Sequence, residues 1–499
     1  KDGIPGQKGI DDLLTESRQG GFFDEEKFYR LTGQADFGRD ILKTVALRSS
    51  HGTHVMDVAA GEPPEDNCKN RPIICVQLPT TATADTSGSK FDPYVLDAVR
   101  YIIDRADQYS KKEGIGALPI VINFSYGIIA GPHDGTSPLE AELDNIITAR
   151  RKIAPIEVIL PSGNSHLDRA HAKVQFNSDG DTTKMHWRLA PDDRTSSFME
   201  IWMPYRAPSG GGAPPSRMSA SLALPANGGE SPPLPENHNT GYIGLIDGDP
   251  VCLIFYRVQP FPTERGQFFI ALLPTGFLDP PTKLAPSGLW NVKLINNELK
   301  CEQPVEAWVQ RDDTPYGYPQ RGRPSYFDER CYQRFTAGGF VETQDTVDCF
   351  VKRAGSISAI ATGDEPVVIA GIQRQEMQMA PLSAGGPVTG TRGGLPDSYR
   401  PDAATVSDDS DVFQGVFGAG TRSGSIIALD GTSVAAPRIA RWVANELAGN
   451  ANGNRQAVQA FAAAQESGYP PSTPPKPPQI RAGAGRIKLD PTYEIKRYD

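Results

Sequence analysis

The sequence predicts an α/β fold: a parallel sheet with helices on both faces, interrupted by a β-sandwich. In the first third of the chain, short apolar runs alternate with amphipathic helical segments, which indicates a parallel sheet covered by helices. From about residue 166 to 352, apolar and polar residues alternate and Pro/Gly-rich loops intervene, which is typical of antiparallel strands in a sandwich or jelly roll. The α/β pattern then returns, so we expect the middle region to be an insertion in a loop.

The first third supplies specific elements. Apolar runs at 72–79 (PIICVQLP), 119–124 (PIVINF) and 158–160 (VIL) predict buried strands. Helices are predicted to begin at Asp92-Pro93 and Ser137-Pro138, because each pair sets a capping residue before a proline at the first helical position.

The rest of the chain divides into the insertion, the second part of the α/β domain and a C-terminal extension. Alternating strands are expected at 198–203, 218–224, 251–256, 267–273, 290–294 and 305–309. A core strand at 356–362 (SISAIAT) and a helix from Thr432 to about Leu447 would complete the α/β domain. The predicted domains are therefore 1–165 and 353–449 for the α/β domain, 166–352 for the insertion, and 450–499 for a C-terminal extension. The proline segment YPPSTPPKPP in that extension predicts an extended surface tether.

Composition narrows the functional classes. A chain of 499 residues usually holds two or three domains. A formal net charge of −10, with no run of five Lys or Arg residues, argues against nucleic-acid binding. The sequence contains no stretch of 18 apolar residues, so it predicts no membrane-spanning helix. The six cysteines lack CxxC spacing, so they indicate neither a zinc site nor a dense disulfide framework and leave the compartment open.

Three short motifs carry candidate catalytic residues. GTSVAAP puts Ser433 at the start of a helix, where backbone N–H groups and the helix dipole would stabilise an alkoxide; an ordinary helix cap is the alternative. HGTHV offers His51 as a general base, although a histidine pair at this spacing could also bind a metal. PSGNS places Asn164 after a buried strand, where its amide could donate to an oxyanion or simply form a turn.

Taken together and in this order, these motifs resemble those of the subtilases, the subtilisin-like serine peptidases. The resemblance implies a subtilisin-like sheet, Ser433 as nucleophile, His51 as general base and Asn164 in the oxyanion hole. It covers about residues 1–165 and 355–447. The segments LSAGGP (382–387), RPDAA (400–404), GAGTRSG (418–424) and AGAGRIKL near the end of the chain also resemble the family.

The same resemblance implies a substrate site. INFSYG (122–127) resembles the segment on which subtilases bind substrate as an added strand. Ser125, Tyr126 and Gly127 are therefore expected to bind substrate, together with Ser162 and Gly163.

The acidic member of the triad departs from the family pattern. Subtilases carry it as Asp-x-Gly, whereas Lys1 stands two residues before Gly3 here and Asp2 is displaced by one position. Asp2 is the first candidate. Further candidates are Asp11, Asp12, Asp36 and Asp40.

Two rival hypotheses stay open. A chain that has lost the acid would be a catalytically impaired pseudoenzyme that binds proteins. A carbohydrate-binding sandwich would need exposed aromatic residues, whereas Trp202, Trp290 and Trp308 are expected in cores.

The expected substrate is a polypeptide, and the chemistry requires no cofactor. Many subtilases bind structural calcium, but no acidic loop motif clearly indicates a metal here; SDDSD (407–411) is too generic. Neither nucleic acid nor membrane is an expected partner, and the inserted β domain offers a surface for a protein partner.

Overall fold

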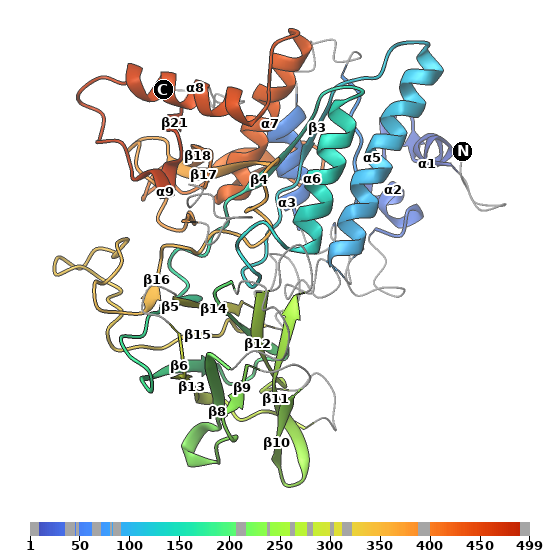
Figure 1. Ribbon diagram of the computed structural model, residues 1–499. Coiled ribbons are helices and arrows are strands. Elements are labelled where there is room, and N and C mark those ends of the chain that lie inside the picture. The colour runs from blue at the N-terminus through green and yellow to red at the C-terminus, as the bar shows by residue number, and fades with distance from the viewer. Residues whose placement is uncertain are drawn as a thin grey trace.

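The computed structural model describes residues 9–34, 45, 49–61, 71–79, 82, 91–205, 216–236, 240–259, 265–276, 283–299, 304–311, 322–387 and 400–489. These residues form two units that lie end to end (Figure 1). One is a sheet flanked by helices, and the other is built of two β-sheets. We call them the α/β unit and the β unit.

The α/β unit is built on a five-stranded parallel sheet with strand order β21-β18-β17-β4-β3. Its strands are β3 (Ile120–Asn123), β4 (Ile156–Pro161), β17 (Val367–Gln373), β18 (Ala403–Asp408) and β21 (Arg486–Ile487). Strands β3 and β4 lie at the predicted runs 119–124 and 158–160. Because β17 and β18 come from the far side of the insertion, the two halves of the chain complete one sheet.

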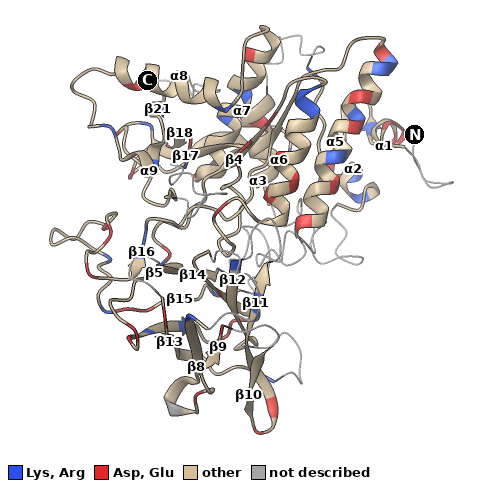
Figure 2. Cartoon of the chain, viewed as in Figure 1, with Lys and Arg blue, Asp and Glu red and all other residues tan. Residues whose placement is uncertain are grey.

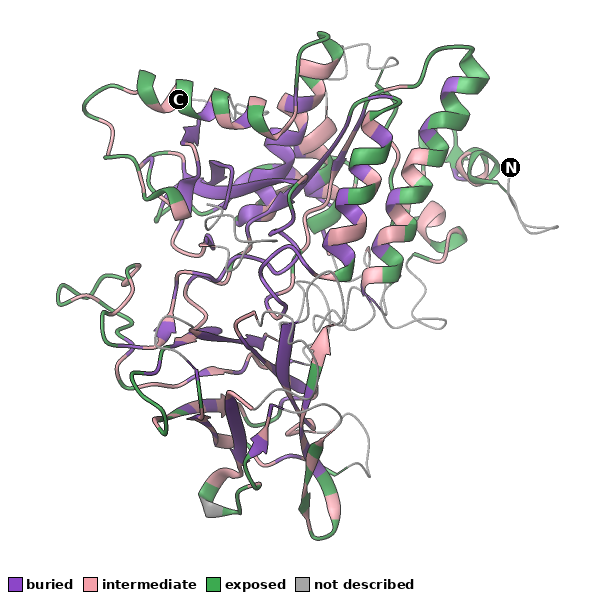
Figure 3. Cartoon of the chain, in the orientation of Figure 1, coloured by how far each residue is buried: buried purple, intermediate pink, exposed green. Residues whose placement is uncertain are grey.

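Helices cover both faces of this sheet. Ile156, Val158 and Leu160 of β4 pack toward α5 (Phe91–Glu113) and α6 (Pro138–Arg151). Ile159 packs on the opposite face, toward α7 (Thr432–Ala448) and α8 (Arg455–Gly468). Successive side chains of a strand point to opposite faces, so the continuous apolar run of β4 buries both. The strands lie in the buried core while charged residues occupy the outer sides of α5 and α6 (Figures 2 and 3).

Two predicted strands are not strands. Residues 71–79 have no ladder partner and are mostly exposed, although Ile74 and Leu78 pack against the core. Residues 356–362 are buried in turns and irregular backbone, and the strand expected there begins only at Val367. An apolar run does not by itself specify backbone conformation, so both segments match the pattern without forming ladders.

The remaining helices and short strands of the α/β unit lie around this sheet. They are α1 (Ile10–Glu16), β1 (Arg18–Gln19), β2 (Phe22–Phe23), α2 (Glu25–Leu31), α3 (His51–Ala60), β19 (Val416–Ala419), β20 (Ile426–Leu429) and α9 (Gln479–Ala482). The C-terminal region is more than a tether, because Val458 and Ala462 of α8 are buried and β21 pairs with β18.

The β unit consists of two antiparallel sheets that share one core. The seven-stranded sheet has the order β10-β11-β12-β7-β14-β5-β16, and the five-stranded sheet has the order β15-β6-β13-β8-β9. The strands are β5 (His171–Val174), β6 (Thr182–Leu189), β7 (Ser197–Trp202), β8 (Met218–Ala223), β9 (Leu234–Pro235), β10 (Gly241–Ile246), β11 (Asp249–Gln259), β12 (Arg265–Leu272), β13 (Gly288–Asn296), β14 (Val305–Gln310), β15 (Tyr326–Phe327) and β16 (Val351–Lys352). The predicted sandwich is confirmed.

Side chains within the β unit bear on two further expectations. Trp202, Trp290 and Trp308 are all buried, so these tryptophans form no exposed aromatic groove. A disulfide joins Cys331 to Cys349, while Cys75 and Cys252 are free thiols; Cys68 and Cys301 lie outside the described residues.

The two units meet through buried polar and aromatic contacts. The Arg265 guanidinium donates to Asp134 Oδ2 at 2.6 Å and to the Pro132 carbonyl at 2.6 Å. The rings of His133 and His171 both stack on Trp308, with centroids 4.0 and 4.8 Å away. Separating a buried ion pair leaves an uncompensated charge inside the protein, which is energetically costly. These contacts therefore hold the two units in a fixed arrangement.

Acidification is expected to weaken this contact. Burial is the main reason that the pKa of His133 falls to about 3, and the charges of His171 and Arg265 add to the shift. Burial also lowers the pKa of His171, against the opposing effect of Glu306. His133 titrates near 6.5 when unfolded, so between pH 6.5 and about 3 the unfolded chain binds a proton at this residue that the folded chain does not, and His171 acts in the same direction. The free energy of unfolding should therefore decrease as the pH is lowered through this range, by up to about 1.4 kcal/mol per pH unit from His133.

Thermal unfolding midpoints at pH 7.5 and 4.5 test this expectation. His133→Phe keeps an aromatic ring against Trp308 and removes the titrating group, so its midpoint should drop less on acidification than that of the wild type. His186→Phe, in the five-stranded sheet, is the matched control. Equal pH dependence in wild type and His133→Phe would contradict the assignment.

Candidate active site

The first turn of α7 presents Ser433. Its N-cap, Gly431, has φ +117°, and a Cβ there would lie 3.0 Å from Asn164 Nδ2, so both conformation and space demand glycine. Ser433 is the second residue of the helix and is half-buried, whereas Thr432 and Val434 on either side are buried. The hydroxyl therefore lies at the positive end of a 17-residue helix.

A proline inside α7 connects this turn to the 125–127 segment. Pro437 has no N–H, so the carbonyl of Ser433, four residues earlier, has no donor in the helix ladder. The Ser125 hydroxyl donates to that carbonyl at 2.9 Å. The predicted substrate segment is thus attached directly to the nucleophile candidate.

The side-chain amide of Asn164 is fixed in orientation. Its Oδ1 accepts from the backbone N–H and from the hydroxyl of Thr432, both at 2.9 Å. The Gly163 N–H donates to the same hydroxyl at 3.1 Å. With Oδ1 held, the Nδ2 donor is directed away from Thr432 on an exposed residue beside Ser433. Thr432 is a positioning residue that sequence reasoning did not single out, although it lies within GTSVAAP.

His51 and His54 differ although they share α3. His54 is fully buried, and its ring nitrogen Nε2 donates to the Val416 carbonyl at 2.8 Å. A Cβ on Gly418 would lie 2.6 Å from the His54 ring, which explains the glycine. His51 is exposed at the first position of the helix. Partial desolvation still lowers its pKa, and His54 adds to the shift, so His51 is neutral at pH 7.

Two anchors show that α3 and α7 run in the same direction. Near the start of α3, His54 is bonded to Val416, whose ladder partner Leu429 lies just before α7. At the end of α3, the Arg441 guanidinium, in the third turn of α7, donates to the Val58 carbonyl at 3.1 Å. His51 and Ser433 therefore lie in the first turns at the same end of the helix pair. Their side chains are not hydrogen-bonded to each other in the described structure.

The other predicted site residues have mixed positions. The ring of Tyr126 packs against the core, stacked on Phe91 with the two ring centroids 4.4 Å apart. Ser162 is fully buried and Gly163 has φ +103°.

Neither of the two candidate acids that the structure describes is hydrogen-bonded to His51. Asp11 and Asp12 lie in the first turn of α1, where Asp12 caps the Gly9 N–H. Asp2, Asp36 and Asp40 fall outside the described residues.

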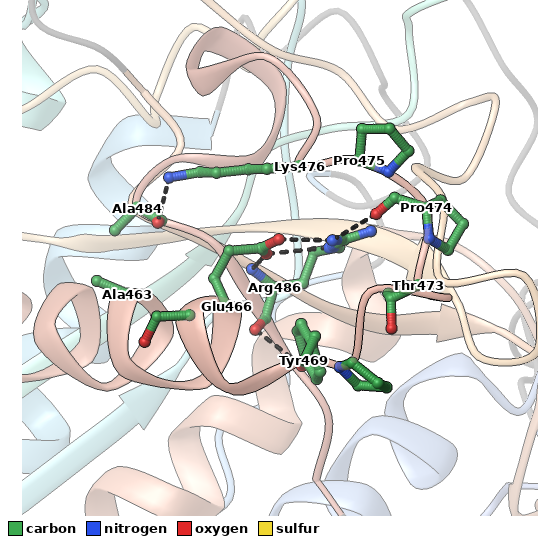
Figure 4. Close-up of a pocket in the computed structure, with 11 residues that line it drawn as sticks. Ala463, Glu466, Tyr469, Thr473, Pro474, Pro475, Lys476, Ala484 and Arg486 are labelled. Atoms are coloured by element: carbon green, nitrogen blue, oxygen red, sulfur yellow. Dashed lines mark hydrogen bonds and ion pairs between the residues drawn. The ribbon is translucent and has the colours of Figure 1, made fainter.

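No group of three metal-ligating side chains occurs among the residues the structure describes, and none of the described helices has the length and apolar character to cross a membrane. Two cavities in the described part of the chain lie away from Ser433. One, of about 460 Å³, lies between α8, the proline segment and β21, where Arg486 is paired with Glu466 (Figure 4). The other, of about 300 Å³, is lined by Asp144, Lys152 and neighbouring polar residues.

Comparison with solved structures places this geometry on a known fold. The Clostridium perfringens CspB protease matches with a TM-score of 0.59 over 96% of this chain and 85% of that chain, at 13% sequence identity. What the two share is the fold. The match confirms the predicted fold class, a subtilisin-like parallel sheet interrupted by a β-sandwich.

The predicted membership of the subtilase family is wrong. No family model matches the chain, and no curated protein matches it either. The resemblance to the family is therefore confined to short motifs, such as those around His51, Asn164 and Ser433, and does not extend over the sequence as a whole. A fold is maintained by burial and pairing that many sequences satisfy, so it persists where sequence similarity does not.

Proposed function

We propose that this chain is a serine endopeptidase that hydrolyses polypeptides through an acyl-enzyme on Ser433. The observation that carries the proposal is the pair of contacts at the start of α7: Ser125 bonded to the Ser433 carbonyl and Asn164 bonded to Thr432. They bring a nucleophile, an amide donor and an exposed backbone segment to one place on a peptidase-like fold.

Each group has a proposed role. His51 takes the proton of the Ser433 hydroxyl as it attacks the peptide carbonyl, and later gives that proton to the leaving amine. Asn164 Nδ2 and the Ser433 N–H stabilise the oxyanion, and water then hydrolyses the acyl-enzyme. The substrate lies extended along Ser125–Gly127. Asp2 is the proposed acid that orients His51, and no cofactor takes part.

Labelling with a fluorophosphonate tests the nucleophile. The full chain should be labelled at Ser433, and Ser433→Ala should lose the label while Ser467→Ala, at the exposed end of α8, keeps it. Loss of the label in Asp2→Ala would support Asp2 as the acid. A folded wild-type chain that is not labelled would contradict the peptidase proposal and favour the protein-binding pseudoenzyme.

Removing the amide donor should slow the chemical step. Asn164→Leu keeps the shape of the side chain but donates no hydrogen bond, so kcat should fall about 10²- to 10³-fold. KM should change little, because the oxyanion exists only near the transition state. Steady-state kinetics on a fluorogenic peptide measure both constants.

Thr432→Val serves as the companion variant. It removes the hydroxyl that holds Asn164 Oδ1 but leaves the backbone N–H in place, so a smaller loss in kcat is expected. An Asn164→Leu variant with wild-type kcat would exclude the amide from catalysis.

A further inference from the structure

Two backbone segments flank Ser433, and each presents a glycine. Ser125–Gly127 is attached through the 2.9 Å bond from Ser125 to the Ser433 carbonyl. Gly163–Asn164 is attached through the bonds to Thr432. With no side chain on Gly127 or Gly163, the region between these segments is where a substrate side chain next to the scissile carbonyl could enter.

Ser358 occupies this region. A Cβ added at Gly127 would lie 2.7 Å from Ser358 Oγ, and one added at Gly163 would lie 3.3 Å from the Ser358 nitrogen and 3.6 Å from its Cβ. A single residue therefore stands against both glycines.

Hydrogen bonds hold Ser358 in place. Its N–H donates to the Ser162 carbonyl at 2.7 Å, and the Ala359 N–H donates to the Ile128 carbonyl at 2.8 Å. The Ser358 hydroxyl also donates to Ile128, at 3.2 Å. The backbone at 358–359 thus bridges the two segments that flank the nucleophile. Because Ser358 is only 3% exposed, little room remains above it.

The β unit positions this bridge. Trp308 Nε1 donates to the Gly355 carbonyl at 3.0 Å, and His171 Nδ1 donates to the Ala354 carbonyl at 2.6 Å. Gly355 has φ +76°, and a Cβ there would lie 2.6 Å from the His171 ring. The chain leaving the insertion is therefore fixed three residues before Ser358.

We propose that Ser358 is a specificity-determining residue that limits the substrate residue on the acyl side of the scissile bond to glycine, alanine or serine. The carbonyl of that residue must reach Ser433 Oγ with its oxygen toward Asn164, which directs the side chain between Gly127 and Gly163, onto Ser358. A large side chain would have to displace a segment held by both units. This inference rests on the proposed peptidase function.

The test uses tetrapeptide p-nitroanilides that differ only in the residue before the anilide: Gly, Ala, Leu or Phe. For the wild-type chain, kcat/KM on the Ala substrate should exceed that on Phe by about 10²-fold or more. Ser358→Gly should raise kcat/KM on the Phe substrate at least about tenfold and so reduce the ratio of kcat/KM on Ala to kcat/KM on Phe. Ser356→Gly, a matched change two residues earlier, should leave the ratio unchanged.

A second variant keeps the test decisive if Ser358→Gly does not fold. Ser358→Thr adds one methyl group and should restrict cleavage further, toward the Gly substrate. Cleavage after Phe as fast as after Ala by the wild type, abolished in Ser433→Ala, would overturn the inference and leave the peptidase intact. No cleavage of any substrate, together with no fluorophosphonate label, would overturn both.

Discussion

Replacing His51 by alanine is expected to lower kcat for peptide hydrolysis about 10⁶-fold, the loss seen when the base of a serine peptidase triad is removed. The Ser433 hydroxyl is a weak nucleophile unless a base accepts its proton during attack. His51 lies in the first turn of α3, at the same end of the helix pair as Ser433. His54, with its ring already bonded to Val416 in the core, cannot take over.

The pH dependence of kcat/KM tests independently whether His51 acts as the general base. A general base acts in its neutral form, and desolvation, together with His54, lowers the pKa of His51 from 6.5. The value of kcat/KM should therefore rise with pH through an apparent pKa below 6.5 and stay constant at neutral pH. His186→Ala, in the β unit, is the control and should retain wild-type rates. Residual activity in His51→Ala near that of the wild type would remove His51 from the mechanism.

Replacing Asp402 by alanine is expected to lower the free energy of unfolding by about 3–5 kcal/mol, the cost of breaking a buried ion pair. Its carboxylate is fully buried and accepts from the Val368 N–H at 2.8 Å, from Arg455 Nε at 2.5 Å, and from the Arg400 guanidinium. Burial lowers the pKa of Arg400, and Asp402 opposes that shift, so its removal strands a cation inside the protein. Urea and thermal midpoints measure the loss.

Two variants separate the ion pair from a general packing effect. Arg400→Met in the Asp402→Ala background removes the stranded charge and should recover part of the stability. Glu142→Ala breaks the exposed pair with Arg100 and should cost less than about 1 kcal/mol. A loss for Asp402→Ala no larger than that for Glu142→Ala would show that the pair contributes little.

The buried pair of Arg400 and Asp402 also explains one of the sequence motifs. RPDAA resembled a subtilase segment, and in the structure Arg400 and Asp402 tie the start of β18 to the start of β17. The residues of the motif therefore serve the sheet that supports α7. A short match can be retained for stability alone, which is consistent with a chain that no family model matches.

The sequence by itself determined the order of strands and helices and the separation into two architectures. Local signals are enough for this: Ser137 followed by Pro138 caps and starts α6, and alternating apolar residues mark β13 as a strand with one buried face. The same signals placed Ser433 in the first turn of a helix and Asn164 after a buried strand. The runs at 72–79 and 356–362 were wrongly predicted as strands because an apolar run does not specify ladder pairing: the first is mostly exposed and the second is buried in turns.

Only the tertiary structure decided how these residues come together. The bond from Ser125 to the Ser433 carbonyl spans 308 positions in sequence and exists because Pro437 leaves that carbonyl without a helical donor. Likewise, Ser358 reaches Gly127 and Gly163 only after the chain has passed through the whole β unit. Contacts of this range depend on the global path of the backbone, which no local pattern of side chains encodes.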